Sequence, residues 1–256
     1  MSARVCVLAS GSKGNCTYVS DGVTHLLIDA GLSCRRTEQE LLKLGVAIAD
    51  IDAILLTHEH IDHTYGLVTI ERKFKTPVLT NRATANSVDV KLTTDIKQFC
   101  KDNFDTGFKC GTIYVTPFRI MHDAVCPVGY TLTVGGHRIS YVTDLGHVTD
   151  GVRQNVVGSE LVILESNHDL EMLATGSYPP ELQARIRSNN GHLSNDQSAR
   201  FARELAASGT KYIVLAHLSE ENNTPSLALK ASQQAVGEGV RWVVASQNAA
   251  TEIIEL

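Results

Sequence analysis

The chain has 256 residues, of which 43% are hydrophobic and 20% are charged. This is the composition of a globular protein with a sizeable core, and it excludes intrinsic disorder. The net charge of −5 excludes a generic nucleic-acid-binding polycation. No apolar run is long enough for a membrane-spanning helix, and the N-terminus does not resemble a signal peptide. The six cysteines form no CxxC pair, so we expect reduced thiols and a cytoplasmic protein. The sequence has no low-complexity tract, long linker or break in composition, so we expect a single domain over residues 1–256.

Short β-rich runs alternate with amphipathic segments along the chain. The predicted strands cover residues 5–8, 25–29, 53–56, 78–80, 113–116, 130–134, 139–143, 161–164 and 212–216. Residues 37–40 are typical of a capping box that begins a helix, which Gly45 should end, and residues 194–197 predict a second helix start. Gly135 and Gly136 predict a hairpin turn. Runs of strands with helices interspersed favour two packed sheets with helices outside.

Ligand-type side chains are concentrated directly after the predicted strand 53–56. His58, His60, Asp62 and His63 all fall within six positions of the segment THEHIDH. They cannot all face one metal from a regular strand or helix, whereas a loop can direct them into two pairs. Imidazole and carboxylate donors without thiolate suit zinc, with manganese or iron as alternatives. The sequence therefore predicts a metal site at the end of this strand.

The HxHxDH pattern after a strand resembles the signature of the metallo-β-lactamase superfamily. Members of that family also have an Asp, a His, a second Asp and a final His, each at the end of a strand. Asp29, His122, Asp144 and His217 occupy these positions in the correct order. The resemblance implies an α+β fold, an αββα four-layer sandwich built from two similar halves, with two divalent metal ions at one end of the sheets.

The same resemblance assigns the metal ligands residue by residue. It implies that one ion is bound by His58, His60 and His122, and the other by Asp62, His63 and His217. It further implies that Asp144 bridges both ions and that Asp29 orients the ligand loop from behind. Two such ions would hold a bridging hydroxide for hydrolysis, most naturally of a phosphodiester.

Further short segments narrow the resemblance to one group of this superfamily. Together they resemble the bacterial YycJ/WalJ (VicX-like) group, over at least residues 5–225. The segments are ASGSKGNC at 9–16, PVGY at 127–130, TDLG at 143–146, LESNHD at 164–169, GHLSN at 191–195, AHLS at 216–219 and NNTP at 222–225. The resemblance implies a nuclease, with 5′-to-3′ exonuclease action on double-stranded DNA, and favours DNA over RNA as the partner.

Three residues are expected to act in catalysis. His192 is a candidate general acid or phosphate clamp, because an imidazolium can protonate a leaving 3′-oxygen. Glu165 is a candidate for orienting it, as paired Glu and His residues do in the related ribonuclease Z, and Asp62 is expected to serve in catalysis as well as in metal binding. The alternative for His192 is that it only caps the helix near Ser194.

A second set of residues is expected to contact the substrate. Its members are Ser10, Ser12, Asn15, Asn167, His168 and Asn222. The alternatives are a tight β-turn for the first three, helix capping for the next two and bracing of the metal loop for the last. Residues 72–119 carry nine basic side chains and four Asp, which would hold DNA phosphates if they flanked the site. The alternative is a solvated helical face, which explains most such runs.

Other functions remain open from the sequence. An RNA-processing nuclease or a hydrolase of small esters or thioesters could use the same fold and ligands. A non-catalytic metal-binding regulator linked to cell-wall signalling is a further alternative. The intact ligand set disfavours this regulator, because a scaffold does not require an open dinuclear site.

Overall fold

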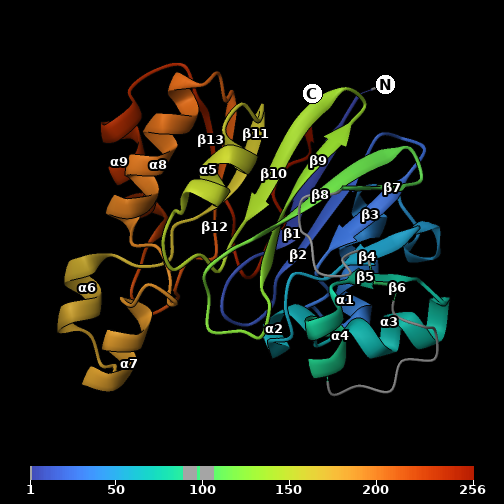
Figure 1. The fold of residues 1–256 in the computed structure, drawn as a ribbon, viewed down its shortest axis with the longest axis horizontal. Coiled ribbons are helices and arrows are strands. Elements are labelled where there is room, and N and C mark those ends of the chain that lie inside the picture. Colours follow the sequence, from blue (N-terminus) through green and yellow to red (C-terminus); the bar gives the residue numbers. More distant parts are fainter. Residues whose placement is uncertain (1, 89–96, 99–106) are drawn as a thin grey trace.

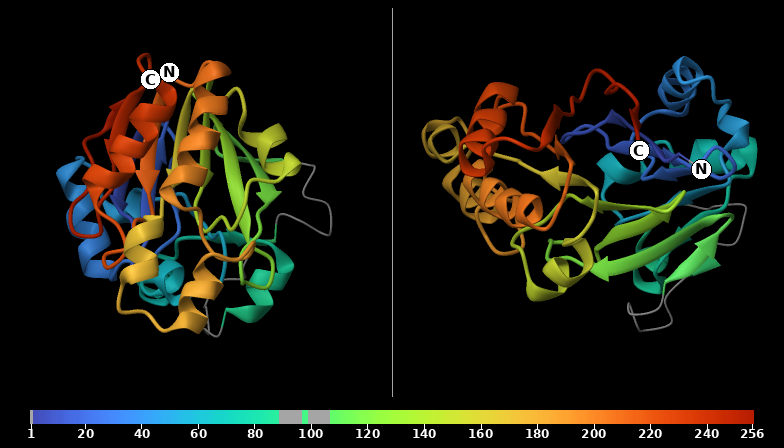
Figure 2. Two further views of the ribbon diagram at one scale, coloured as in Figure 1. Left: turned by 90° about the vertical axis from the view of Figure 1, so that its left-hand side faces the viewer. Right: turned by 90° about the horizontal axis from the view of Figure 1, so that it is seen from above.

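The computed structural model describes residues 2–88, 97–98 and 107–256. Within these residues, two mixed sheets of seven strands each pack face to face, and helices cover both outer surfaces (Figures 1 and 2). The predicted αββα sandwich and its α+β class are therefore confirmed.

The first sheet contains the N-terminal strands and the last strand of the chain. Strands β1 to β3 are antiparallel to one another, whereas β3 to β6 run parallel. In spatial order the strands are β14 (Ile254–Glu255), β1 (Arg4–Ala9), β2 (Cys16–Ser20), β3 (His25–Ile28), β4 (Ala53–Leu55), β5 (Val78–Thr80) and β6 (Lys97–Gln98).

The second sheet repeats this pattern. Strands β7 to β10 are antiparallel, and β10 to β13 run parallel. In spatial order the strands are β13 (Arg241–Val244), β12 (Tyr212–Ala216), β11 (Leu161–Glu165), β10 (His137–Val142), β9 (Val128–Val134), β8 (Ile113–Arg119) and β7 (Phe108–Cys110). Gly135 and Gly136, both at positive φ, form the predicted turn between β9 and β10.

Three apolar layers hold the sandwich together. In β1, Val5 and Val7 face the core between the sheets, whereas Cys6 and Leu8 face the helices on the other side. Both faces of such a strand are buried, which explains its continuous apolar run. Helices α1 (Cys34–Lys43) and α3 (Leu67–Phe74) contribute to the outer layer of the first sheet, and α5 (Asp150–Val156), α8 (Asn195–Ala207) and α9 (Pro225–Val236) to that of the second.

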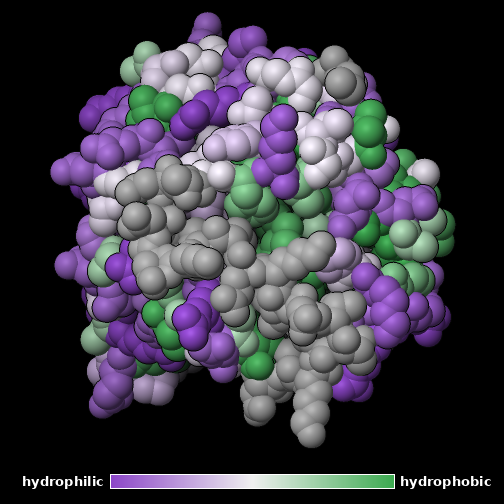
Figure 3. All heavy atoms as spheres, turned by 45° about the vertical axis from the view of Figure 1, so that its right-hand side comes forward, coloured by the Kyte–Doolittle hydropathy of each residue, from purple (hydrophilic) through white to green (hydrophobic). Residues whose placement is uncertain are grey.

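Four short helices lie outside these layers or beside them. They are α2 (Ile61–Thr64), α4 (Arg82–Ser87), α6 (Leu170–Thr175) and α7 (Pro180–Ile186), and a 3₁₀ turn covers Ile48–Asp50. In Figure 1, α6 and α7 lie below α8 and α9 at one end of the second sheet. Hydrophilic side chains predominate on the described surface in Figure 3. None of the described helices is long and apolar enough to cross a membrane.

The helix starts show where local sequence rules succeed and fail. The second predicted start is confirmed, because Ser194 and Gln197 form a capping box at α8. The first is wrong by four residues, because the N-cap of α1 is Ser33, whose hydroxyl accepts from the Arg36 N–H, and not Thr37. Gly45 follows the end of α1 at a φ of 75°, as expected.

Candidate metal centre and active site

Strands of both sheets end at polar residues that meet in one place. Asp29 follows β3, Asp144 follows β10 closely, Glu165 ends β11 and His217 follows β12. Asp29, Asp144 and His217 have φ values of 62°, 57° and 56°, in the left-handed region that non-glycine residues rarely adopt. Among the described non-glycine residues, only Lys75 shares this feature. Backbone strain therefore concentrates where the strands end at the site.

The four ligand-type residues after β4 project from two kinds of backbone. His58 and His60 lie in the loop that follows the strand, whereas Asp62 and His63 belong to the one-turn helix α2. The second pair therefore projects from a helix rather than from a loop. The rings of His58 and His63 nevertheless lie close together, with centroids 4.1 Å apart.

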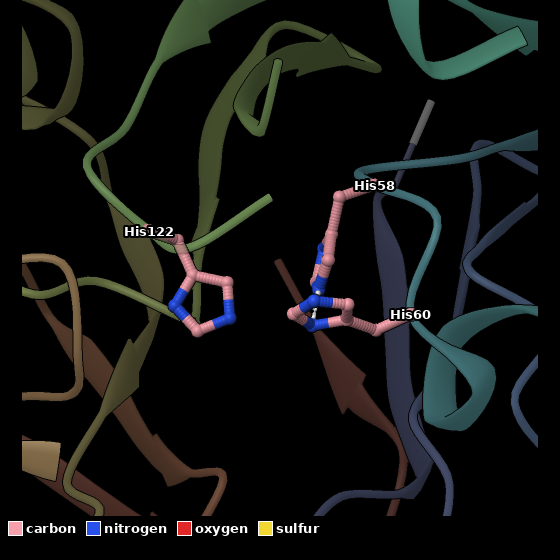
Figure 4. Close-up of side chains that lie close together, drawn as sticks. All are labelled: His58, His60 and His122. Carbon is pink, nitrogen blue, oxygen red and sulfur yellow. Dashed lines mark hydrogen bonds between the residues drawn. The ribbon is translucent and has the colours of Figure 1, made fainter. Parts of the chain in front are cut away.

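His58 and His60 meet a histidine from the other half of the molecule. Figure 4 shows His122 on the loop after β8, facing both of them across the site. One ring nitrogen from each of the three histidines lies within 4.8 Å of the others. Nε2 of His58 is 3.1 Å from Nδ1 of His60. Three imidazoles from two loops can therefore converge on one cation.

Asp62 and His63 meet His217 in the same way, with donor atoms within 4.8 Å of one another. Asp144 lies between the two groups. Its Oδ2 is 3.3 Å from Nε2 of His63, and its Oδ1 is 3.5 Å from Nε2 of His217 and 3.7 Å from Nε2 of His122. The structure thus brings all seven predicted ligand positions together, with Asp144 at the centre.

Two of these buried groups lack the partners that burial requires. Oδ2 of Asp144 and Nε2 of His217 are buried without any hydrogen-bond partner among the described residues. Buried polar atoms are normally hydrogen bonded, and buried charges are paired or bind metals. The donors are imidazole nitrogens and carboxylate oxygens, a set that binds divalent cations of the zinc type. The residues present therefore fit divalent metal ions.

The electrostatics of the cluster favour positive charge at its centre. Burial by itself would lower the pKa of His217, but nearby carboxylates outweigh burial and raise that pKa to about 10. These carboxylates are Asp144, Asp62 and Glu165. His58 shows the opposite effect, because burial and the neighbouring His63 hold its pKa well below the usual value. His58 is therefore a neutral imidazole, the form that binds metals.

Asp29 lies behind the ligands and does not line the cavity. Its Oδ2 accepts a hydrogen bond from Nδ1 of His63 at 2.8 Å. Its Oδ1 accepts the Thr57 backbone N–H at 2.8 Å, and the Thr57 hydroxyl also donates to the carboxylate. Both ends of the ligand motif are tied to this one carboxylate, and His63 is left with Nε2 toward the site.

Glu165 connects His192 to the metal-ligand cluster. Its Oε1 is 2.7 Å from Nδ1 of His192 and 3.0 Å from Nδ1 of His217. Its Oε2 accepts the backbone N–H groups of Leu145 and Leu193. Burial would raise the pKa of Glu165, but the two histidines outweigh burial and lower it to about 2. The carboxylate is therefore ionised and holds His192 with Nδ1 turned inward.

A cavity of about 360 Å³ opens over these residues. His60, Asp62, His122, Asp144, His192 and His217 line it. The predicted substrate contacts Ser12 and Asn167 also line it, and Nδ2 of Asn167 donates to the His217 carbonyl. The lining further includes residues to which the sequence analysis gave no role, namely Asp123, Tyr178, Leu182, Arg185, Ile186, Gly191 and Ser219.

The other four predicted substrate contacts lie outside the cavity lining. The Ser10 hydroxyl accepts the His217 backbone N–H and donates to Asn15, whose Nδ2 donates to Asp62. His168 and Asn222 are buried. Ser10 and Asn15 therefore lie behind the ligands and support them, whereas a role for His168 and Asn222 in contacting the substrate stays a prediction.

The basic segment 72–119 is only partly described. Lys91 and Lys101 lie outside the described residues, and Lys97 is described only as part of strand β6. The described basic residues lie in or just after α3, in α4 and in β7 and β8, and none of them lines the cavity. A role for this segment in holding DNA stays a prediction.

Three comparisons place the chain among known proteins. Residues 24–218 match the model of the β-lactamase superfamily domain. The chain is 38% identical to exodeoxyribonuclease YycJ of Bacillus anthracis, covering 93% of this chain and 90% of that protein. It is 35% identical to exodeoxyribonuclease WalJ of Streptococcus pneumoniae, covering 99% and 98%.

The fold has a close counterpart among solved structures. The metallo-β-lactamase fold protein YhfI from Bacillus subtilis superposes with a TM-score of 0.76 over the full length of both chains, at 18% identity. The family model matches three quarters of the chain, and the two relatives match nearly all of it. The chain belongs to the β-lactamase superfamily, in the family that includes YycJ and WalJ, and it is a metal-dependent hydrolase.

Proposed function

We propose that the protein is an exodeoxyribonuclease that shortens double-stranded DNA in the 5′-to-3′ direction. The names of the two relatives, exodeoxyribonucleases YycJ and WalJ, support DNA as the substrate. The observation that carries the proposal is the meeting of seven ligand positions and the Glu165–His192 pair around one open cavity. This arrangement suits hydrolysis of a phosphodiester.

Two divalent ions would occupy the cluster, with zinc favoured and manganese or iron as alternatives. His58, His60 and His122 would hold one ion, and Asp62, His63 and His217 would hold the other, with Asp144 shared between them. Ions so placed would lower the pKa of water and stabilise negative charge on phosphate oxygens.

The chain's own residues supply the proton transfers in this proposal. His192 directs Nδ1 to Glu165, and Nε2 has no hydrogen-bond partner among the described residues. That nitrogen would donate a proton to the leaving 3′-oxygen as a general acid. Asp62 reaches the cavity, and its histidine neighbours hold its pKa well below the usual value despite burial. Its carboxylate would accept a hydrogen bond from the attacking water.

The proposal also covers the substrate contacts, the type of nucleic acid and the location of the protein. Ser12 and Asn167 line the cavity and would contact the substrate there. DNA is favoured over RNA, in line with the names of the relatives. The cysteines in the described part of the chain are free, which supports a reducing, cytoplasmic location.

The experiment that tests the proposal is digestion of end-labelled duplex DNA, with or without a 5′-phosphate, in zinc or manganese. Wild type should shorten the duplex stepwise from the 5′ end. His192→Ala should retain its metal and lose about 100-fold in rate, the usual contribution of a general acid. His60→Ala and Asp144→Ala serve as controls against a contaminating nuclease.

Each alternative function has its own outcome. Cleavage of RNA precursors or of small esters, with no action on DNA by metal-loaded protein, would replace DNA as the substrate. Bound metal without hydrolysis of any phosphodiester would support the non-catalytic regulator. Full nuclease turnover by metal-loaded His192→Ala would remove His192 from the mechanism.

A further inference from the structure

Helix α7 lies beside the cavity but has no buried residue of its own. Arg185 and Ile186 follow Leu182 by three and four residues, so both lie on the same side of the helix as Leu182, and all three line the cavity. Tyr178, in the segment between α6 and α7, lines the same wall. One face of α7 and Tyr178 thus form a partly exposed wall of the cavity.

This wall is attached directly to the catalytic residues. The His192 backbone N–H donates to the Ile186 carbonyl at 2.9 Å. Gly191 packs so tightly against the end of α7 that a Cβ atom there would lie 2.1 Å from the Ile186 carbonyl oxygen. On the other side, Arg185 pairs with Asp123, whose Oδ1 is 3.2 Å from Nε2 of His122. The position of α7 is therefore set by the loops that carry His192 and His122.

The wall combines a cationic side chain with an aromatic one. Arg185 is the only Lys or Arg among the described residues that line the cavity. Its ion pair uses Nε and Nη2, and the other N–H groups have no partner in the described part of the chain. The Tyr178 hydroxyl likewise has no hydrogen-bond partner among the described residues. A guanidinium with free donors suits phosphate, and an aromatic ring suits a base.

The size of the cavity limits what can enter. At about 360 Å³ it is at the lower end of the range of pockets for small molecules. A base-paired helix end does not fit into such a space, whereas one nucleotide withdrawn from the stack does. Unstacking of this kind is how enzymes bring a buried group of DNA to their reacting atoms.

We propose that the segment 176–186 is the binding site for the terminal nucleotide of the strand being cut, with Tyr178 stacked on its base and Arg185 bound to its phosphate. This inference rests on the proposed function, because it names the part of a DNA substrate that occupies the cavity. It makes Tyr178 and Arg185 substrate-binding residues and assigns no proton transfer to either.

To test this nucleotide site, the binding of DNA and its cleavage are measured separately. The binding probe is a 5′-phosphorylated DNA duplex with phosphorothioate linkages at its ends, titrated into metal-loaded protein. Tyr178→Ala should raise Kd about ten-fold, the effect of one lost base–aromatic stack, and Tyr178→Phe should restore it. Arg185→Ala should raise Kd similarly and reduce the slope of log Kd against log salt by about one.

Two matched variants control for general effects. Tyr114→Ala removes an exposed tyrosine from β8, and Arg187→Ala removes the exposed arginine that follows α7. Neither lines the cavity, so both should bind the probe as wild type does. Bound metal is measured for every variant, because Arg185 lies close to His122 through Asp123.

The outcomes separate this inference from the proposed function. Wild type that digests DNA, with Tyr178→Ala and Arg185→Ala binding the probe unchanged, would overturn the inference and leave the function standing. Binding that depends on Tyr178 and Arg185 in a protein that cleaves no DNA would support the nucleotide site and reject the nuclease. A loss of binding in Arg185→Ala that only follows a loss of metal would remove Arg185 from the site.

Discussion

The two halves of the sandwich share one strand pattern but supply the metal centre differently. The first half provides His58, His60, Asp62 and His63 from six consecutive positions. The second half provides His122, Asp144, Glu165, His192 and His217, each from the end of a different strand or from a separate loop. A compact motif anchored at one strand therefore completes its site only when the second sheet packs against the first.

The largest effect is expected when a predicted metal ligand is removed, and it should differ between Asp144 of the second half and His60 of the first. Asp144 lies between both groups of donors, so Asp144→Ala should abolish binding of both ions and lower the rate on DNA about 1,000-fold or more. His60 belongs to only one group, so His60→Ala should release one ion and retain the other. Metal content per chain and the rate of DNA digestion check this prediction. Equal metal loss in the two variants would contradict a shared role for Asp144.

A smaller effect is expected for the carboxylates that orient ligands in each half. Asp29 accepts from Nδ1 of His63, and Glu165 accepts from Nδ1 of His217 and of His192. Asp29→Asn and Glu165→Gln should each weaken metal affinity about 10- to 100-fold. Glu165→Gln should also remain slow at saturating metal, because it loses the group that positions His192. Titration with metal, followed by rates at saturation, separates the two effects.

The chain contains a matched control for these carboxylates. Glu160 accepts a hydrogen bond from Nδ1 of His137 at 2.8 Å, in the same geometry but away from the cavity. Glu160→Gln should leave metal affinity and rate unchanged. An equal loss of metal affinity in Glu160→Gln would mean that the effects at Asp29 and Glu165 are not specific to the site.

The smallest expected effect is on stability, where a turn of one half contacts a turn of the other. Asp21 accepts the hydroxyl of Thr112 at 2.5 Å and the N–H groups of Val23 and Thr24. Burial would raise the pKa of Asp21, but these hydrogen bonds outweigh it and lower that pKa. Asp21→Asn should therefore reduce the free energy of unfolding by about 1–2 kcal/mol at pH 7.

The sign of the pH dependence follows from the lowered pKa. The folded protein binds the Asp21 proton more weakly than the unfolded chain, so the stabilisation is fully present above the usual pKa of about 4. It is lost as pH falls through the folded pKa. Urea unfolding measures the free energy of unfolding of wild type and Asp21→Asn, and the two values should converge at acid pH. The control is Asp150→Asn, because the side chain of Asp150 is 94% exposed. A constant difference at all pH values would contradict the prediction.

Much of the site could be predicted because its chemistry is local in the chain. The spacing from His58 to His63 indicates metal binding by itself, and the resemblance supplied His122, Asp144 and His217. The supporting roles of Ser10 and Asn15 could not be predicted, since their partners His217 and Asp62 are distant in sequence. The sequence did not indicate that Tyr178 and Arg185 line the cavity. Helix α7 has no buried residue, and hence no strong apolar periodicity by which it could be recognised.

Strands β2, β6, β7, β13 and β14 were not predicted. The residue pattern alone predicted the other nine strands, the capping box at Ser194, the hairpin at Gly135 and Gly136, and the ligand motif. Each depends on residue types within a few positions, where propensity, turn chemistry and ligand spacing operate. Three features could not be predicted in this way: which strand ends meet, the contact of Glu165 with both His192 and His217, and the wall of the cavity formed by α7. These features depend on the packing of two sheets, whose contacts join residues far apart in the chain.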